Sequence, residues 1–243
     1  MVRFFVTPDV FMSDAPALFD DNAAHAKVLR LKPGEQVLLC DGQGREALCE
    51  VTELNSTCLL LSVLERRESG TEPAVSVAVY MAMPKADKLE HVIQKAVELG
   101  ANEIVTFPTA RCISKPDEKS LSKKLDRWQK IAASASEQCG RGVIPAVRVL
   151  ASYKEALAQA ATADMALLFY ENERATTLQQ TLNSKSYHTV SLLSGPEGGF
   201  EAWEVEQAMD AGLTVCTLGS RILRCETAPL CALSAVMFHS GEF

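Results

Sequence analysis

The chain has 243 residues and a net charge of −7, with 47% hydrophobic and 23% charged residues. This length fits one large domain or a small domain plus a medium one, with enough apolar residues for a sizeable core. The negative charge argues against a protein that coats nucleic acid, because such binding depends on many phosphate contacts. No apolar run approaches the ~20 residues that span a bilayer, and the first residues break too early for a secretory signal. We therefore expect a cytoplasmic protein with no membrane partner.

Charge is unevenly distributed along the chain. Residues 111–148 hold nine Lys and Arg against four Asp and Glu, a local charge of +5, whereas residues 1–72 hold seven against twelve. A basic strip suits docking on one RNA feature, but a solvated helix face has the same pattern. The eight cysteines include no Cys-x-x-Cys pair, and the four histidines are scattered. We therefore expect no metal site and no disulfide framework.

The N-terminal region is typical of β structure with one short helix, around 21–29. Short apolar stretches are separated by turn signals, of which Pro33-Gly34 and Asp41-Gly42-Gln43-Gly44 are the clearest. The charged segment 65–73 contains Gly and Pro without periodicity, which indicates a linker. We predict a small barrel over 1–72 and a second domain over 73–243. The expected strands of the barrel are 3–6, 36–40, 47–51 and 58–64.

After the predicted linker, strands alternate with helices. This pattern favours an α/β fold with a parallel sheet. The clearest helix follows Pro116, where apolar residues recur at steps of four and three up to Cys139 and basic residues occupy the other faces. The expected strands are 75–81, 104–107, 165–170, 189–193 and 214–218, and the other expected helices are 87–99, 153–162, 174–182, 201–211 and 227–239.

Two segments at predicted strand ends in this second domain have unusual composition. One runs from Leu192 to Phe200 and carries three glycines and a proline, and the other runs from Thr217 to Pro229 and carries Gly219, two arginines and a glutamate. Ligands of parallel α/β proteins bind beyond the carboxyl ends of the strands, where glycines let a ligand approach the backbone. Neither segment matches a dinucleotide or phosphate-loop motif. Each segment taken alone could be a simple turn.

Together the two segments resemble a known family. Gly195-Pro196-Glu197-Gly198-Gly199-Phe200, followed by Leu218-Gly219-x-Arg221-Ile222-Leu223-Arg224-x-Glu226-Thr227-Ala228, is similar to the signature of the RsmE family. These are 16S ribosomal RNA (uracil-N3) methyltransferases of the SPOUT superfamily. Shorter stretches agree across nearly the whole chain, among them Arg3-Phe4-Phe5, Gln94-Lys95-Ala96 and Glu137-Gln138-Cys139-x-Arg141. Cys225 departs from the pattern, since the family usually has Thr there.

The resemblance implies a PUA-like β-barrel for RNA docking and a SPOUT-type α/β domain whose parallel sheet is tied in a trefoil knot. It also implies a homodimer with the active site near the subunit interface. S-adenosylmethionine would bind among three loops: one after Phe169, one at 194–199 and one at 218–224. The cofactor-binding residues implied are Phe169, Leu193, Ser194, Gly195, Glu197, Gly198, Gly199, Leu218, Gly219, Ile222, Leu223, Arg224, Thr227 and Ala228.

Uridine N3 carries a proton that must leave before the nitrogen is a good nucleophile. A guanidinium could stabilise the negative charge that develops on the uracil carbonyls, and a carboxylate could accept the proton. Our candidates are Arg141, Arg221 and Arg224 for the first role, with Arg141 and Arg224 the most important. Glu197 and Glu226 are the candidates for the second role, and a structural salt bridge is the alternative for Glu226.

The expected substrate is 16S rRNA, either free or in an assembled small ribosomal subunit. Two alternatives stay open: a SPOUT methyltransferase acting on transfer RNA, and a non-catalytic RNA-binding assembly factor. A nucleotide-binding α/β protein would lack its phosphate loop. The candidate RNA contacts are Arg3, His25, Arg30, Arg111, Lys123, Lys124 and Arg127.

Overall fold

The computed structural model describes residues 1–114 and 116–243, which divide into two compact units. Unit 1 comprises Met1–Glu72 together with Ser136–Ile144, and unit 2 comprises Pro73–Ala135 together with Pro145–Phe243. The sequence predicts a boundary after residue 72. It gives no signal that the segment 136–144 returns to the first unit.

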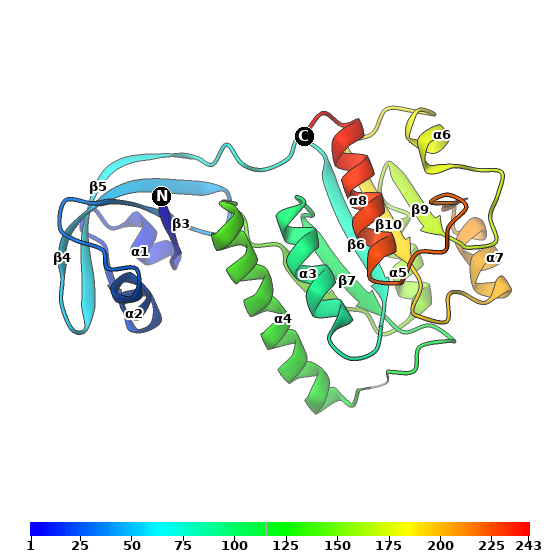
Figure 1. The fold of residues 1–243 in the computed structure, drawn as a ribbon, viewed down its shortest axis with the longest axis horizontal. Coiled ribbons are helices and arrows are strands. Elements are labelled where there is room, and N and C mark those ends of the chain that lie inside the picture. The colour runs from blue at the N-terminus through cyan, green and yellow to red at the C-terminus, as the bar shows by residue number, and fades with distance from the viewer. Residues whose placement is uncertain (115) are drawn as a thin grey trace. The chain divides into compact units, whose positions relative to one another are not determined.

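Unit 1 is built on a five-stranded sheet with the order β1-β3-β4-β5-β2. Strand β1 pairs with β3 in parallel, and the other neighbours are antiparallel. Register shifts between β4 and β5 mark irregularities of the kind that bend and twist a sheet, and both strands curve in Figure 1. Phe4, Phe11, Leu39 and Leu59 are among the buried core residues. The elements are β1 (Val2–Phe5), α1 (Pro8–Met12), β2 (Ala17–Phe19), α2 (Asp20–Val28), β3 (Gln36–Cys40), β4 (Arg45–Leu54) and β5 (Cys58–Glu68).

The turn predicted at Asp41–Gly44 joins β3 to β4 as an antiparallel hairpin, which confirms the sequence signal. The Asp41 carboxylate accepts hydrogen bonds from the backbone N–H groups of Gln43 at 2.8 Å and Arg45 at 3.1 Å. Gly42 and Gly44 have φ angles of +73° and +101°, a region that residues with a Cβ rarely adopt. The turn is therefore specified by its own residues.

Unit 2 contains a six-stranded sheet with the order β11-β9-β10-β6-β7-β8. All of its strand pairs are parallel, as the alternating pattern predicts. Every residue of β9 is buried, as expected where helices cover both faces of a sheet. Helix α8 packs on β6 and β10 beside α3, and α5 packs on the same two strands (Figure 1). The strands are β6 (Ser76–Ala82), β7 (Glu103–Phe107), β8 (Ala146–Val149), β9 (Met165–Phe169), β10 (Thr189–Ser194) and β11 (Thr214–Cys216).

Apart from α6, the helices after residue 87 agree closely with the predicted ranges. Helix α6 is shorter than expected because Thr177 caps it: the Thr177 hydroxyl accepts from the Gln180 N–H, and the Gln180 side chain accepts from the Thr177 N–H. The helices are α3 (Lys88–Glu98), α4 (Glu118–Cys139), α5 (Tyr153–Ala160), α6 (Leu178–Leu182), α7 (Ala202–Asp210) and α8 (Thr227–His239). The trefoil knot that the resemblance implies stays a prediction.

The predicted linker was wrong at its start. Residues 65–68 continue strand β5 and pair with β4. Their charges are matched across the sheet, since the Arg67 guanidinium donates to the Glu46 carboxylate at 2.8 Å. Opposite charges on neighbouring strands stabilise a sheet, so a charged sequence here is compatible with a strand. Elements α1, β2 and β8 were not predicted.

Candidate active site

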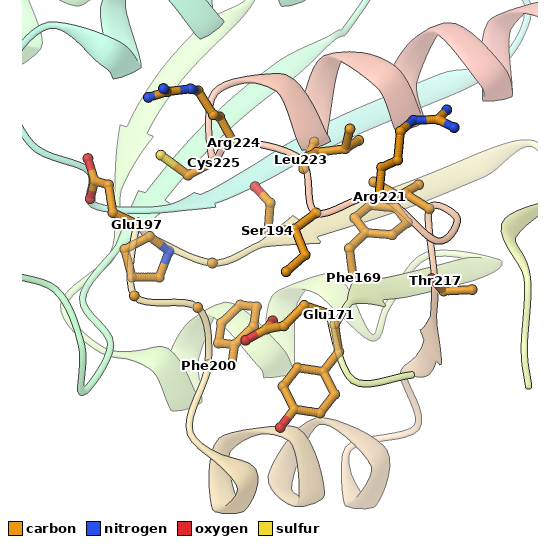
Figure 2. A pocket seen from close by; sticks show the side chains of 18 of the residues that line it. Phe169, Glu171, Ser194, Glu197, Phe200, Thr217, Arg221, Leu223, Arg224 and Cys225 are labelled. Carbon is orange, nitrogen blue, oxygen red and sulfur yellow. The ribbon is translucent and has the colours of Figure 1, made fainter. Parts of the chain in front are cut away.

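The carboxyl ends of three adjacent strands, β11, β9 and β10, meet at one cavity of about 430 Å³ (Figure 2). This volume lies in the range of small-molecule sites, and the strand ends of a parallel sheet are where such ligands bind. The loops after these strands supply most of the lining. The lining residues are Lys88, Phe169, Tyr170, Glu171, Arg174, residues 194–200, residues 217–225 and Ala228.

The loop after β10 has no room for larger residues at its glycines. A Cβ on Gly195 would come within 3.2 Å of the Gly199 backbone, and Gly199 itself has a φ of +67°. Phe200 ends the loop as a fully buried anchor, with its ring 5.9 Å from that of Tyr153. The backbone therefore forms a close-fitting wall of the cavity, which is what a flat ligand needs.

Arg111 supports this wall from outside. Its guanidinium donates to the Gly198 carbonyl at 2.7 Å and to both carboxylate oxygens of Glu201 at 2.9 Å. A bidentate pair of this kind fixes geometry as well as charge. The sequence suggests Arg111 as an RNA contact, but its donors are engaged in holding the glycine loop. These contacts favour a supporting role for Arg111 over a role in RNA binding.

The loop after β11 forms a turn of its own. The Thr217 hydroxyl accepts from the Gly219 N–H at 3.2 Å and donates to the Gly219 carbonyl at 3.1 Å. Gly219 has a φ of +111°, so the turn requires glycine. Ile222 is 81% exposed despite its apolar side chain.

Lys88, the first residue of α3, connects two of the loops. Its ammonium lies 3.1 Å from the Glu197 carboxylate and 3.3 Å from the Glu226 carboxylate. The Glu197 carboxylate also accepts the Lys85 N–H at 3.1 Å, and the Cys225 thiol donates to Glu226 at 3.2 Å. These contacts join the glycine loop to the start of α8. We call Lys88, Glu197 and Glu226 the lysine cluster.

The lysine cluster keeps its members ionised at neutral pH. Hydrogen bonding to Glu197 is the main reason that the pKa of Lys88 is raised. Burial alone would raise the pKa of Glu197, but backbone N–H donors and the Lys88 ammonium lower it below its ordinary value. The pKa of Glu226 is lowered mainly by its own backbone N–H, with smaller contributions from Cys225 and Lys88. Burial raises the pKa of the Cys225 thiol to about 11, so it is a neutral donor.

Most of the cofactor-binding residues proposed from sequence line this one cavity. Two do not: Leu193 is fully buried in β10, and Thr227 is an exposed residue at the start of α8. Of the catalytic candidates, Glu197, Arg221 and Arg224 line the cavity, and both arginines are exposed. Glu226 is the residue before α8 and meets the cavity through Lys88.

Arg141, a catalytic candidate from the sequence, is not among the residues that line the cavity. It belongs to unit 1, is only 4% exposed, and pairs with the Glu72 carboxylate at 2.6 Å. Glu72 also accepts the backbone N–H groups of Gly142 and Val143 at 3.0 and 3.1 Å. This arrangement fixes the returning segment within unit 1. The geometry favours a structural role for Arg141 over the catalytic role suggested by the sequence.

The remaining RNA candidates differ in how accessible they are. Arg3 is 9% exposed and donates to Glu46 at 3.0 Å inside unit 1, so its guanidinium is a poor candidate for phosphate binding. The His25 side chain is 41% exposed and lies 4.0 Å from Glu137. Arg30, Lys123 and Arg127 are exposed, and Lys124 is half-buried. Arg127 pairs with Glu90 at 2.7 Å.

Sequence reasoning missed Lys88, Glu171 and Arg174, all of which line the cavity. Glu171 and Arg174 follow the predicted strand at 165–170, so the rule that ligands bind after such strands could have found them. No sequence pattern marks Lys88 as a cavity residue, because its position depends on how α3 packs against the two loops. No group of residues in the described chain is arranged to hold a metal ion. No helix in the described residues is long and apolar enough to span a membrane.

Comparison with known proteins gives a consistent result. Residues 71–237 match the RNA methyltransferase domain family, and residues 19–63 match the RNA methyltransferase PUA domain. The chain is 36% identical to ribosomal RNA small subunit methyltransferase E of Bacillus subtilis over 221 residues, which covers 88% of this chain and 85% of that protein. The crystal structure of ribosomal RNA small subunit methyltransferase E from Neisseria gonorrhoeae, bound to S-adenosylmethionine, has a TM-score of 0.88 and 33% identity, covering 98% and 97% of the two chains. A Legionella pneumophila methyltransferase in complex with the same cofactor has a TM-score of 0.85 and 28% identity, covering 98% and 97%.

The parallel sheet, the cavity at its strand ends and the two matched regions define an RNA methyltransferase with a PUA domain. The similarity extends over both units and over nearly the full length of these relatives. The chain belongs to the ribosomal RNA small subunit methyltransferase E family, which confirms the resemblance found in the loops at 195–200 and 218–228.

Proposed function

We propose that this protein uses S-adenosylmethionine to methylate N3 of a specific uridine in 16S rRNA of the small ribosomal subunit. One observation carries the proposal: three adjacent strand ends of a parallel sheet converge on a single cavity with a glycine-lined wall. Relatives named ribosomal RNA small subunit methyltransferase E, one of them solved with S-adenosylmethionine bound, support methylation of small-subunit rRNA.

The cavity fits the cofactor chemically. Its glycine wall leaves space that a Cβ would fill, and Phe169, Leu218 and Leu223 offer apolar surface for an adenine ring. Arg221 and Arg224 can bind a carboxylate. When bound, S-adenosylmethionine would supply a methyl group activated on a sulfonium. The chain's task is then to hold and align the reactants and to exclude water.

Arg221 and Arg224 are also the residues best placed to stabilise negative charge on the uracil carbonyls, since both line the cavity and are exposed. Glu197 lines the cavity, and its carboxylate is our candidate to accept the N3 proton. Glu226 does not line the cavity and is held by Lys88 and Cys225, so we assign it a structural role. The target base must leave any stack to reach this site, which is easiest in a loop or single strand.

For substrate docking we propose the accessible members of the predicted set. His25 and Arg30 lie on unit 1, and Lys123 and Arg127 lie on α4. Because each would contact phosphate or a base edge, their joint replacement by Ala should weaken rRNA binding and reduce its salt dependence. Unchanged rRNA affinity in the quadruple variant would contradict this assignment. A ribosomal RNA substrate implies that the protein works in the cytoplasm.

We further propose that the protein is a homodimer through α8. This helix is apolar on nearly all sides: it buries Leu233 and Val236 within unit 2, while Phe238 is 74% exposed and Cys231 is exposed. A helix that is apolar all round is normally covered on all sides. Light scattering after size exclusion should give twice the mass of the chain, 26.4 kDa, and a monomer would contradict the proposal.

The direct test of function is mass spectrometry of small-subunit rRNA from cells with and without the gene. Loss of a single N3-methyluridine in the deletion strain is the expected result. An unchanged small-subunit rRNA accompanied by loss of a tRNA methylation would support a tRNA enzyme instead. No change in any RNA would favour a non-catalytic assembly factor.

A further inference from the structure

Glu171 places a carboxylate in the cavity that the proposed mechanism does not use. It lies two residues after β9, is half-buried and lines the cavity. In the part of the chain that the structure describes, its carboxylate makes no hydrogen bond or ion pair. The guanidinium of Arg111, which is close enough to be influenced by Glu171, is already engaged by Glu201 and Gly198.

The carboxylate is held against the glycine loop. A Cβ on Gly199 would lie 2.7 Å from one Glu171 oxygen and 3.1 Å from the other. A side chain at residue 199 would therefore push the Glu171 carboxylate out of this position. In Figure 2 the Glu171 carboxylate lies near Phe200, in the lower part of the cavity view. The fold thus brings a carboxylate from the β9 loop to the wall formed by the β10 loop.

A half-buried carboxylate without a partner is unfavourable, because it has lost part of its hydration without gaining hydrogen bonds. A ligand that donates hydrogen bonds would remove this cost. S-adenosylmethionine offers two kinds of donor: the pair of ribose hydroxyls and the ammonium of its amino-acid end. That end also carries a carboxylate, which suits a cationic part of the site.

The positions of the arginines separate these two possibilities. Figure 2 shows the guanidinium groups of Arg224 and Arg221 at the upper left and upper right of the view, with the Glu171 carboxylate below both. If the amino-acid end of the cofactor lies toward the arginines, its ribose lies toward Glu171. Pairing of an acidic side chain with ribose hydroxyls is a solution that other parallel α/β proteins use for nucleotides.

We propose that Glu171 is a cofactor-binding residue that accepts hydrogen bonds from the ribose hydroxyls of S-adenosylmethionine. This rests on the proposed function, since it assigns a contact within the same cofactor site. It adds a binding determinant on the third loop, beside those that the glycine and arginine motifs supply. It also gives a reason for glycine at position 199 that does not depend on the cofactor touching that residue.

The test is calorimetric titration of the full-length protein and its Glu171→Gln variant with three ligands. These are S-adenosylmethionine, S-adenosylhomocysteine and 5′-methylthioadenosine, which keeps the ribose and adenine but lacks the amino-acid end. Because a neutral amide oxygen is a weaker acceptor than a carboxylate, we expect all three to bind about 10-fold more weakly to the variant. Glu206→Gln, an exposed carboxylate on α7, is the matched control and should change none of the affinities.

A weaker affinity only for the two ligands with an amino-acid end would show that Glu171 binds the ammonium, and would overturn the proposal. Unchanged affinity for all three would overturn it as well. A second measurement needs no protein variant: 5′-methylthio-2′-deoxyadenosine should bind the wild-type protein more weakly than 5′-methylthioadenosine, and Glu171→Gln should remove most of that difference. If the wild-type protein binds none of these ligands, the proposed function itself fails. Binding by wild type with no effect of Glu171→Gln rejects only the role of Glu171.

Discussion

The lysine cluster provides the sharpest prediction, because a single ammonium holds two loops of the cavity. Replacing Lys88 by Met keeps most of the side chain's length and removes its charge. The variant leaves Glu197 and Glu226 facing each other, each of which lies within 3.3 Å of the ammonium in the wild type. We expect the glycine loop and the start of α8 to separate more often, so that the cofactor finds the complete site less frequently.

The size of the effect follows from the exposure of the cluster. The Lys88 and Glu197 side chains are each 27% exposed, and Glu226 is 22% exposed, so solvent screens the pairs in part. Surface ion pairs contribute about 0.2–1 kcal/mol each, and partly buried ones somewhat more. Two lost pairs together with repulsion between the carboxylates should cost about 1–2 kcal/mol. If this cost falls on the binding-competent arrangement, the dissociation constant for S-adenosylmethionine rises about 10-fold.

Calorimetric titration of Lys88→Met at low ionic strength measures this directly. Lys95→Met is the matched control, since Lys95 lies on the same helix and pairs with Glu98 at 2.8 Å away from the cavity lining. Adding Glu226→Gln to Lys88→Met removes one of the two facing charges and should recover part of the lost affinity. A Lys88→Met protein that binds the cofactor as tightly as wild type would refute the reasoning.

Three further predictions follow from individual contacts. The pKa values of Glu197 and Glu226 lie below their ordinary value of 4.5. The lysine cluster therefore stabilises the fold above about pH 4.5, and this contribution is lost as pH falls through the lowered pKa values. The difference in Tm between wild type and Lys88→Met should shrink in acid, and a constant difference would argue against the cluster. Gly199→Ala should lower stability by about 1 kcal/mol. It should also weaken cofactor binding, because the new Cβ would displace Glu171. Gly212→Ala, at a φ of +91° with nothing within 4 Å, should lower stability alone, and equal cofactor affinities in the two variants would be inconsistent with the contact between residue 199 and Glu171. Arg141→Ala should lower the free energy of unfolding by about 3 kcal/mol, because it leaves Glu72 without its buried partner. Denaturant titration measures the stability of the variant, and a methyl-transfer assay measures its turnover. Wild-type stability with no turnover would restore the catalytic role.

The parallel sheet and the cavity loops could be predicted because their signals are local. Strands buried on both faces are nearly continuous apolar runs, as in Met165–Phe169, and the glycines after β10 and β11 mark bends that few other residues can make. The turn at Asp41–Gly44 was predicted for the same reason. The family resemblance then joined the two loops into one site, which periodicity alone could not do.

The missed features depend on contacts between distant residues. Helix α1 has five residues, too few for a helical period, and β8 is a four-residue edge strand whose pattern alternates like a surface segment. The positions of Arg141 and Arg111 show a related difficulty. An arginine beside a recognised motif can bind a substrate or fix a loop, and only the location of Glu72 or Glu201 decides between these roles.

The central claim is that the loops after β9, β10 and β11 together enclose S-adenosylmethionine. A crystal structure of the protein grown with this cofactor tests it most directly. We predict density for the adenine against Leu218 and Leu223 and for the ribose beside Glu171. Cofactor density at any other place on the protein, with these three loops closed against one another, would contradict the account.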